Sequence, residues 1–139
     1  MLDDPAGTMY PCLYYDDAMA AIDWLERAFG FQRRLVVPGD ESRPVAHAEL
    51  ALGMGCVMLS SSMPQHGWVS PDRLAGTNQS TCIYLPEVDS VYESALAAGA
   101  KVIFAIEDTD YGSRGFTVRD PEGHDWNFGT YRTGTEWNG

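Results

Sequence analysis

The spacing of hydrophobic residues alternates along this chain between a helical and an extended pattern. Residues 18–29 place apolar side chains three and four positions apart, so they predict a helix with one buried face. The preceding pair Asp16-Asp17 supplies an N-cap, and Gly30 is expected to end the helix. A shorter helix is expected to follow a cap at Asp89 in the second half of the chain.

Short apolar or alternating segments between the helices predict β-strands. Residues 45–52 alternate in character, so one face of that strand should pack against a helix through Ala46, Ala48, Leu50 and Leu52. His47 and Glu49 then share the opposite face, together with Val45 and Ala51. The expected strands are residues 10–15, 31–37, 45–52, 56–60, 80–85, 101–106, 115–119 and 125–131.

Three landmarks recur along the chain at a nearly constant separation, which predicts an internal duplication. Each half then has the order strand, helix, strand, strand, strand. The matched pairs are Tyr14 with Tyr84 (84 − 14 = 70), Gly30 with Gly99 (99 − 30 = 69) and Gly55 with Gly123 (123 − 55 = 68).

The duplication predicts an α+β fold with two tandem βαβββ modules. Mixed, curved sheets with their helices outside would leave a concave cleft for a ligand. The expected parts are a leader (1–9), a single domain (10–131) of two modules (10–60 and 80–131), a linker (61–79) and a C-terminal tail (132–139).

The alternation within the strands separates core side chains from those that should face the cleft. Aromatic and weakly polar groups would line such a cleft, which suits a flat or amphiphilic molecule. The expected core includes Trp24, Ile83, Leu85, Trp126 and Phe128. The expected concave face includes Tyr10, Cys12, Tyr14, Met58, Ser60, Cys82 and Tyr84.

Charge narrows the range of partners. The formal net charge is −11 and the nine Lys and Arg residues are scattered, which argues against a nucleic acid or an anionic membrane as partner. No apolar run reaches the roughly 18 residues of a membrane span, and the acidic N-terminus does not resemble a signal peptide. A cytoplasmic protein with a neutral or cationic small ligand is expected.

The three cysteines, Cys12, Cys56 and Cys82, are odd in number and have no CxxC spacing. This pattern favours neither a disulfide framework nor a cysteine zinc site. Free cysteine is often found in protein cores, so the three thiols are expected to be reduced and buried.

Three segments carry a family resemblance that extends over nearly the whole chain. They are Leu13-Tyr14-Tyr15-Asp16-Asp17 before a helix that ends Ala28-Phe29-Gly30-Phe31; His47-Ala48-Glu49-Leu50 followed by Gly53; and Tyr111-Gly112-Ser113-Arg114 leading into Asp120-Pro121-Glu122-Gly123. With the duplicated module, they resemble the vicinal oxygen chelate superfamily of glyoxalases, extradiol dioxygenases and bleomycin resistance proteins. The third segment is most similar to bleomycin-binding and uncharacterised glyoxalase-like members. The resemblance implies the fold and a homodimer.

Metal-using members of that superfamily place four ligands on the first and last strands of the two modules. The corresponding positions here hold Tyr10, Met58, Ser80 and Asn127, none of which is a good ligand for a divalent metal. Asn127 stands where a carboxylate is expected. No metal or other cofactor is therefore expected, with a divalent metal as the less favoured alternative.

His47 and Glu49 are the remaining candidates for chemistry, because they share one strand face. They could contact a ligand, act as general base and orienting partner, or bind a metal together with His66 or His124. An exposed or structural pair is the alternative. His124 follows the turn glycine and is expected to face solvent, whereas Trp68 in the linker could cover the cleft or pack on the domain.

The favoured function is binding of a small aromatic or cationic molecule in a metal-free cleft, as in the bleomycin-resistance branch. The alternative is a metal-dependent lyase, isomerase or dioxygenase that uses Glu49 as proton acceptor and His47 as ligand or acid. A structural module without a ligand is the third possibility. The expected ligand-binding residues are Tyr10, Tyr14, His47, Glu49, Met58, Trp68, Tyr84, Tyr111 and Asn127.

Overall fold

The computed structural model describes residues 7–137, and its order of elements repeats once along the chain. The first half contains β1 (Cys12–Tyr15), α1 (Ala18–Phe29), β2 (Gln32–Pro38), β3 (Val45–Leu52) and β4 (Gly55–Ser61). The second half contains β5 (Ser80–Tyr84), α2 (Asp89–Ala97), β6 (Lys101–Asp108), β7 (Arg114–Arg119) and β8 (Asp125–Gly129). Two short 3-10 helices lie between the halves, η1 (Pro64–His66) and η2 (Pro71–Arg73).

Each half forms its own four-stranded mixed sheet, in the orders β1-β4-β3-β2 and β5-β8-β7-β6. In both, the first strand is parallel to the last, and the other pairs are antiparallel. Cys12 pairs with Met58 and Cys82 pairs with Asn127, so equivalent positions differ by 70 (82 − 12) and 69 (127 − 58) residues. The predicted α+β class and the predicted duplication are therefore confirmed.

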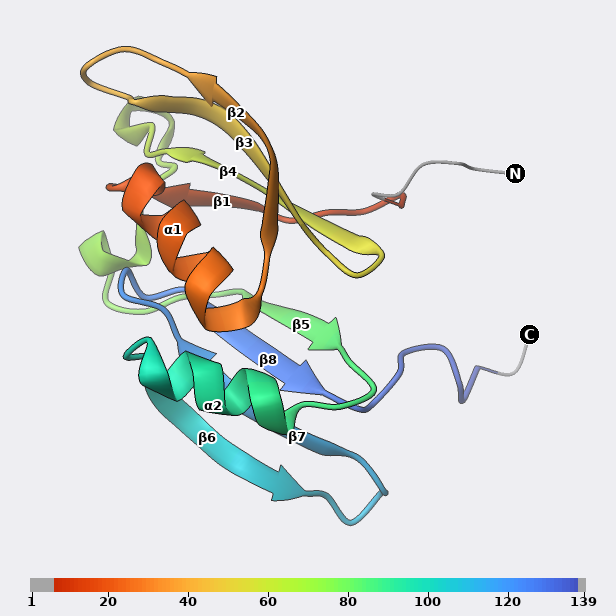
Figure 1. Cartoon of the computed structure of the whole chain (residues 1–139). Helices are drawn as coiled ribbons and strands as arrows, with labels where there is room; N and C mark the ends of the chain where they lie inside the picture. Colours follow the sequence, from red (N-terminus) through yellow and green to blue (C-terminus); the bar gives the residue numbers. More distant parts are fainter. Residues whose placement is uncertain (1–6, 138–139) are drawn as a thin grey trace.

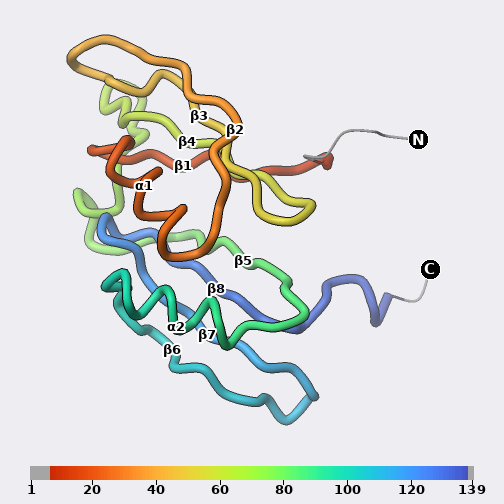
Figure 2. Tube along the Cα trace, in the orientation of Figure 1, coloured from red at the N-terminus to blue at the C-terminus, as the bar shows by residue number. Residues whose placement is uncertain are grey.

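The two helices lie side by side and cover one face of the sheets (Figure 1; Figure 2). Two hydrogen bonds join them: Trp24 Nε1 donates to the Ala98 carbonyl at 2.8 Å, and Ser94 Oγ donates to the Ala28 carbonyl at 2.7 Å. Within the described residues, the two sheets do not join into one. Both α-helices of residues 7–137 lie on the same side, so no α-helix covers the opposite face of either sheet (Figure 1).

Helix α1 has apolar residues at helical spacing, so one side of the helix is buried. Asp17 caps it by accepting from the Ala20 N–H, and Gly30 ends it in the left-handed conformation (φ 81°), as predicted. Its last residue, Phe29, reaches the second module, with ring centroids 4.7 Å from Phe128 and 5.4 Å from Trp126. One core therefore extends through both modules.

Burial confirms most of the predicted core. Trp24, Trp126 and Phe128 are buried, while Ile83 and Leu85 are partly buried and pack against the same cluster. The largest fully buried side chains are Trp126, Tyr15, Phe29, Phe116, Phe128, Ile22, Leu25, Leu50, Leu59, Val45, Val88 and Val118.

The turn between β7 and β8 is built around the buried carboxylate of Asp120. It accepts hydrogen bonds from the Tyr15 hydroxyl at 2.6 Å, from Trp126 Nε1 at 3.1 Å, and from the backbone N–H groups of Glu122 and His124 at 3.0 and 3.1 Å. Burial, and then the nearby Asp120 charge, raise the pKa of Tyr15 well above its ordinary value, so its hydroxyl stays a donor. Asp120 thus joins the first strand of one module to the last strand of the other.

The same turn also holds the start of α1. The Glu122 carboxylate accepts from the backbone N–H groups of Asp16 at 2.6 Å and Asp17 at 2.9 Å, where the positive end of the helix dipole favours a negative charge. Arg73 of η2 binds the Asp16 carboxylate at 2.9 Å and lowers its pKa. Gly123 completes the turn with a φ of 102°, which other residues rarely adopt.

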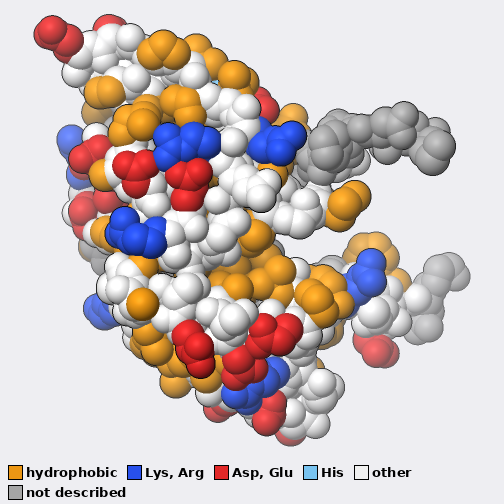
Figure 3. All heavy atoms as spheres, in the orientation of Figure 1, with side chains coloured by type: hydrophobic (Ala, Val, Ile, Leu, Met, Phe, Trp, Pro, Cys, Tyr) orange, Lys and Arg blue, Asp and Glu red, His pale blue; other side chains and the backbone are white. Residues whose placement is uncertain are grey.

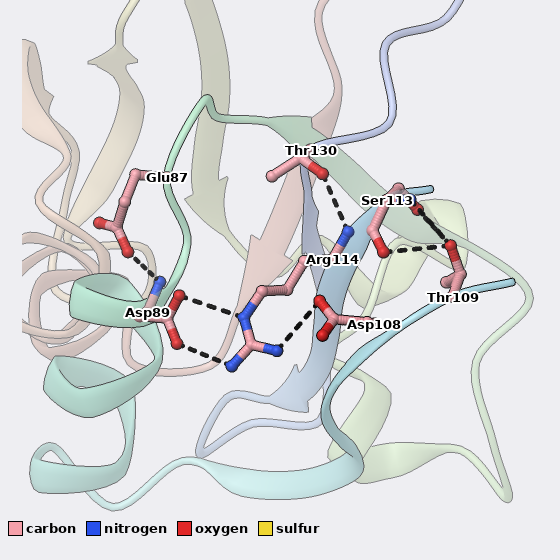
Figure 4. A network of polar contacts seen from close by, with 7 residues as sticks. All are labelled: Glu87, Asp89, Asp108, Thr109, Ser113, Arg114 and Thr130. Atoms are coloured by element: carbon pink, nitrogen blue, oxygen red, sulfur yellow. Dashed lines mark hydrogen bonds and ion pairs between the residues drawn. The ribbon is translucent and has the colours of Figure 1, made fainter. Parts of the chain in front are cut away.

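The predicted cap of α2 is wrong. Val88 is the N-cap and gives no side-chain hydrogen bond, whereas the Glu87 carboxylate accepts from the Asp89 N–H at 2.5 Å. The Asp89 carboxylate instead binds Arg114 of β7, which also contacts Asp108 (Figure 4). The hydrogen bonds from Arg114 lower the pKa of Asp89, so this carboxylate ties α2 to its sheet rather than capping the helix.

Two strand predictions need correction. Tyr10 lies before the first strand, which begins at Cys12, and its side chain is exposed. In β3, Val45 is buried and Ala46 exposed, the reverse of the predicted faces. The pairing with β2 shifts register where Pro38 meets Val45, so the alternation established by the later residues does not extend to this end.

The division into leader, domain, linker and tail stays a prediction. Residues 1–6 of the leader and 138–139 of the tail lie outside the described residues. Between residues 7 and 137, no helix is long and apolar enough to cross a membrane.

On one side the two modules are separated by a notch in which hydrophobic side chains gather (Figure 3).

Candidate ligand-binding site

The uncovered face of the first sheet carries most of the predicted ligand-binding residues. Tyr14 pairs with Ser60, and both Cys12 and Glu49 pair with Met58, so these side chains point to one side of the sheet. The alternate residues face the helices and are buried: Leu13, Ala48, Leu50 and Leu59. The local strand alternation therefore presents the candidate residues on the face that no helix covers.

An aromatic stack stands at one end of this face. The rings of Tyr14 and Trp68 lie 5.3 Å apart with an interplanar angle of 20°, and His66 lies 5.1 Å from Trp68. A bridge between Met63 and Trp68 holds the tryptophan in place, yet 48% of Trp68 remains exposed. Trp68 thus packs on the domain and also offers an open aromatic surface to a ligand.

Tyr14 keeps its phenol proton at neutral pH. Burial, a hydrogen bond with Cys12 and the Cys12 charge raise the pKa of Tyr14 to about 12, while Arg43 opposes the rise. The Arg43 guanidinium is held in place because it donates to the Ser61 and Ser62 carbonyls at 3.2 and 3.3 Å. The stack therefore has a neutral hydroxyl on one of its rings and a fixed cation nearby.

His47 and Glu49 contact each other directly. His47 Nε2 lies 2.7 Å from Glu49 Oε2, and the two side chains are 36% and 40% exposed. A pair this exposed adds little to stability, because water screens it. Glu49 also lines an open hollow of about 630 Å³ with Gln32 and Arg34 of β2, so its carboxylate is accessible to a ligand.

The second sheet has its own smaller hollow, of about 240 Å³, on the corresponding face. Asn127 lines it and donates from Nδ2 to Thr117 Oγ1 at 2.8 Å. Tyr111 also lines it and packs edge to face against Tyr131, with centroids 6.2 Å apart. This hollow offers an amide and aromatic rings.

Within one chain, the predicted residues fall into separate groups. Tyr14, His47, Glu49, Met58 and Trp68 belong to the first module, and Asn127 and Tyr111 to the hollow of the second. Tyr10 lies outside both hollows, and Tyr84 lies beneath the guanidinium of Arg132, which is 5.4 Å from its ring centroid. The structure of one chain does not gather all nine candidates around one ligand.

The strand register shows which residues lie opposite the predicted metal-ligand positions Met58 and Asn127. Met58 pairs with Cys12, not with Tyr10, and Asn127 pairs with Cys82, not with Ser80. Among the residues that the structure describes, no three His, Cys, Asp or Glu side chains converge as a metal site would require. The absence of a metal remains a prediction.

Two further predictions are wrong. Cys12 and Cys82 are exposed rather than buried, because both lie on the uncovered sheet faces. His124 is half-buried rather than free in solvent: its Nε2 lies 2.9 Å from the Tyr14 carbonyl and its ring packs 4.6 Å from that of Tyr15. His124 is thus part of the contact between the modules.

Arg43 is the group near the site that sequence reasoning missed. It lies in the turn between β2 and β3, and its partners near the stack include two backbone carbonyls. Backbone carbonyls leave no signal in a residue pattern. His66 was noticed only as a possible metal ligand, whereas the structure places its ring against Trp68.

Comparison with known proteins is consistent with this architecture. The family model described as Glyoxalase/Bleomycin resistance protein/Dioxygenase superfamily matches residues 8–128. The uncharacterised protein Rv0887c of Mycobacterium tuberculosis is 37% identical over 122 residues, which cover 86% of this chain and 71% of that protein.

Solved structures share the fold. TioX from Micromonospora sp. ML1 has a TM-score of 0.69 and 32% identity, over 91% of this chain and 100% of TioX. The fosfomycin resistance protein FosX from Mesorhizobium loti has a TM-score of 0.65 over 96% of both chains. Its 11% identity supports likeness of fold alone.

Proposed function

The chain belongs to the Glyoxalase/Bleomycin resistance protein/Dioxygenase superfamily, and on this basis we propose that it binds a small, flat aromatic or cationic molecule without a metal ion. The ligand lies against the uncovered face of the first sheet and is sequestered rather than transformed, as the bleomycin-resistance branch would do. The observation that carries this proposal is the stacked pair of Tyr14 and half-exposed Trp68.

The chemistry of that face favours a flat cation. An exposed indole attracts both aromatic rings and positive charge, and stacking of this kind contributes about 0.5 to 2 kcal/mol. The accessible Glu49 carboxylate lies on the same face as Tyr14, and the net charge of −11 attracts cations from a distance. His47 orients Glu49 through their 2.7 Å contact.

A homodimer is part of the proposal. The uncovered faces carry large exposed apolar side chains, among them Leu35 at 44% and Phe104 at 67% exposure. Leu35 pairs with Glu49 and Phe104 with Thr117, so each belongs to a candidate face. A second copy over these faces would bury the exposed apolar side chains and bring Asn127, Tyr111 and the other candidates of one chain to the ligand of its partner.

Location in the cytoplasm likewise remains a prediction.

Truncating the indole is expected to weaken the binding. With proflavine as a flat cationic dye, Trp68→Ala should weaken the affinity about 2- to 30-fold, because the stacking surface is lost. The measurement is a fluorescence titration at physiological ionic strength, where screening limits attraction by net charge alone.

Trp137→Ala is the matched control, since Trp137 is 77% exposed and lies in the C-terminal tail. Its affinity for proflavine should equal that of the unmodified protein. Equal loss in both variants, or no loss in Trp68→Ala, would exclude the aromatic face as the binding site.

The His47–Glu49 contact favours one second candidate, a metal-dependent lyase, isomerase or dioxygenase. If it holds, one of Ni²⁺, Mn²⁺, Fe²⁺ or Zn²⁺ should raise the melting temperature saturably, and His47→Ala or Glu49→Ala should abolish the rise. Glu41→Ala, an exposed glutamate in the β2–β3 turn, is the control. The favoured proposal predicts no saturable stabilisation by any of the four metals.

A further inference from the structure

A groove between the two modules lies away from the stack of Tyr14 and Trp68, although it borders the Glu49 hollow at residues 52–56. It has a volume of about 550 Å³ and lies between the β3–β4 turn of the first module and β5 of the second. Figure 1 shows these elements facing each other, and Figure 3 shows hydrophobic side chains in the notch between the modules. Neither Tyr14 nor Trp68 lines the groove.

The lining is mostly apolar and carries one cation. Its side chains include Met54, Phe31, Leu52, Val57, Ile83 and Leu85. Among the lining residues that the structure describes, Arg132 is the one with an ionised side chain. This volume falls within the range of about 300 to 1,000 Å³ that small-molecule pockets occupy.

Arg132 has no carboxylate partner within residues 7–137. Its guanidinium lies 5.4 Å from the centroid of the Tyr84 ring, and Tyr84 itself lines the groove. In the part of the chain that the structure describes, four of the eight arginines form an ion pair with a carboxylate, and Arg132 is one of the four that do not. A guanidinium stacked on an aromatic ring can still use its N–H fork to bind an anion.

We propose that this groove binds an amphiphilic monoanion, with an apolar body between the modules and a carboxylate against Arg132. The head group of the ligand should be an anion, because the lining supplies one cation and no acidic side chain. The ligand body should be apolar, because the floor of the groove is apolar and burial of apolar surface favours binding. The proposal does not rest on the proposed function, which concerns the first sheet.

Two exposed cysteines allow the site to be located. Cys82 lines the groove, whereas Cys12 is also exposed but does not line it. Decanoate, below its micelle-forming concentration, should slow alkylation of Cys82 by N-ethylmaleimide several-fold while leaving Cys12 unaffected. Decanol, which has the same chain and no charge, should protect Cys82 less. Mass spectrometry of the peptides gives both rates in one sample.

The Arg132→Gln variant tests the head group. The decanoate concentration that half-protects Cys82 should rise about tenfold, because a charge-assisted hydrogen bond is lost. Lys101→Gln makes the same change of charge at an exposed residue outside the groove and should leave that concentration unchanged. Circular dichroism should show both variants folded like the unmodified protein.

Four results would overturn the proposal. Decanoate could protect Cys12 and Cys82 alike, or protect neither, or protect Cys82 equally in Arg132→Gln. If Cys82 is unreactive in the native protein, and Met54→Glu both exposes it and converts a dimer to a monomer in sedimentation, the groove is covered by a second copy instead. None of these results bears on dye binding at Trp68, so the two proposals fail separately.

Discussion

Replacing Asp120 with alanine is expected to lower the free energy of unfolding by about 3 to 5 kcal/mol. The substitution removes the shared acceptor of the Tyr15 hydroxyl and Trp126 Nε1, both buried, and of the Glu122 and His124 N–H groups. A buried donor without a partner costs about 1 to 3 kcal/mol. Urea unfolding followed by circular dichroism measures the loss.

Asp110→Ala is the control for this prediction, because Asp110 is an exposed aspartate in the β6–β7 loop. It should change stability by no more than about 0.5 kcal/mol. Asp120→Asn keeps one acceptor oxygen and should lie between the two. A loss in Asp120→Ala no greater than that in Asp110→Ala would mean that the turn does not join the modules as described.

Truncating Phe29 should destabilise the protein by a similar amount, about 3 to 5 kcal/mol. Phe29 is 2% exposed and its ring packs on Phe128 and Trp126 of the other module. Phe29→Ala would leave a cavity at the contact of α1 with β8. The unfolding transition should also broaden, since the modules would no longer share one core.

Leu74→Ala supplies the comparison, because Leu74 is 55% exposed and lies in the segment between the modules, outside the candidate faces. At one fixed protein concentration, its stability should remain within about 0.5 kcal/mol of the unmodified protein. If Phe29→Ala and Leu74→Ala were equally stable, the two modules would be independent units rather than halves of one core.

The spacing of apolar residues predicted the helices and strands, because each element must bury one face and expose the other. The spacing in residues 18–29 marks the face of α1 that packs inward, and Trp126 and Phe128 alternate with the polar residues of β8 as the buried face requires. The duplication was visible partly because both modules end their helix with a glycine of positive φ, Gly30 and Gly99. Gly55, which was matched with Gly123, has no positive φ; Gly53 takes that conformation in the first module.

Side-chain partners far apart in the sequence could not be predicted in the same way. Asp89 has the position and residue type of a helix cap, yet it binds Arg114, which lies 25 residues later. His124 follows a turn glycine, yet the turn packs against β1 and takes the ring out of solvent. Both outcomes depend on how the modules dock, which local patterns do not encode.

The candidate site was predicted in part. Strand alternation correctly placed Tyr14, Glu49 and Met58 on one face, because directly paired residues must point the same way. It did not reveal that Trp68 would stack on Tyr14, since the linker has no periodicity to follow. It also gave no sign that the two sheets stay separate within a chain.

The uncovered face of the first sheet is expected to bind a flat ligand over Tyr14 and Trp68. A crystal structure of the protein with proflavine tests it most directly. We expect planar density stacked on the Trp68 indole, with the positively charged end of the dye toward Glu49. Dye bound at another surface, with the stack of Tyr14 and Trp68 left empty, would contradict the claim.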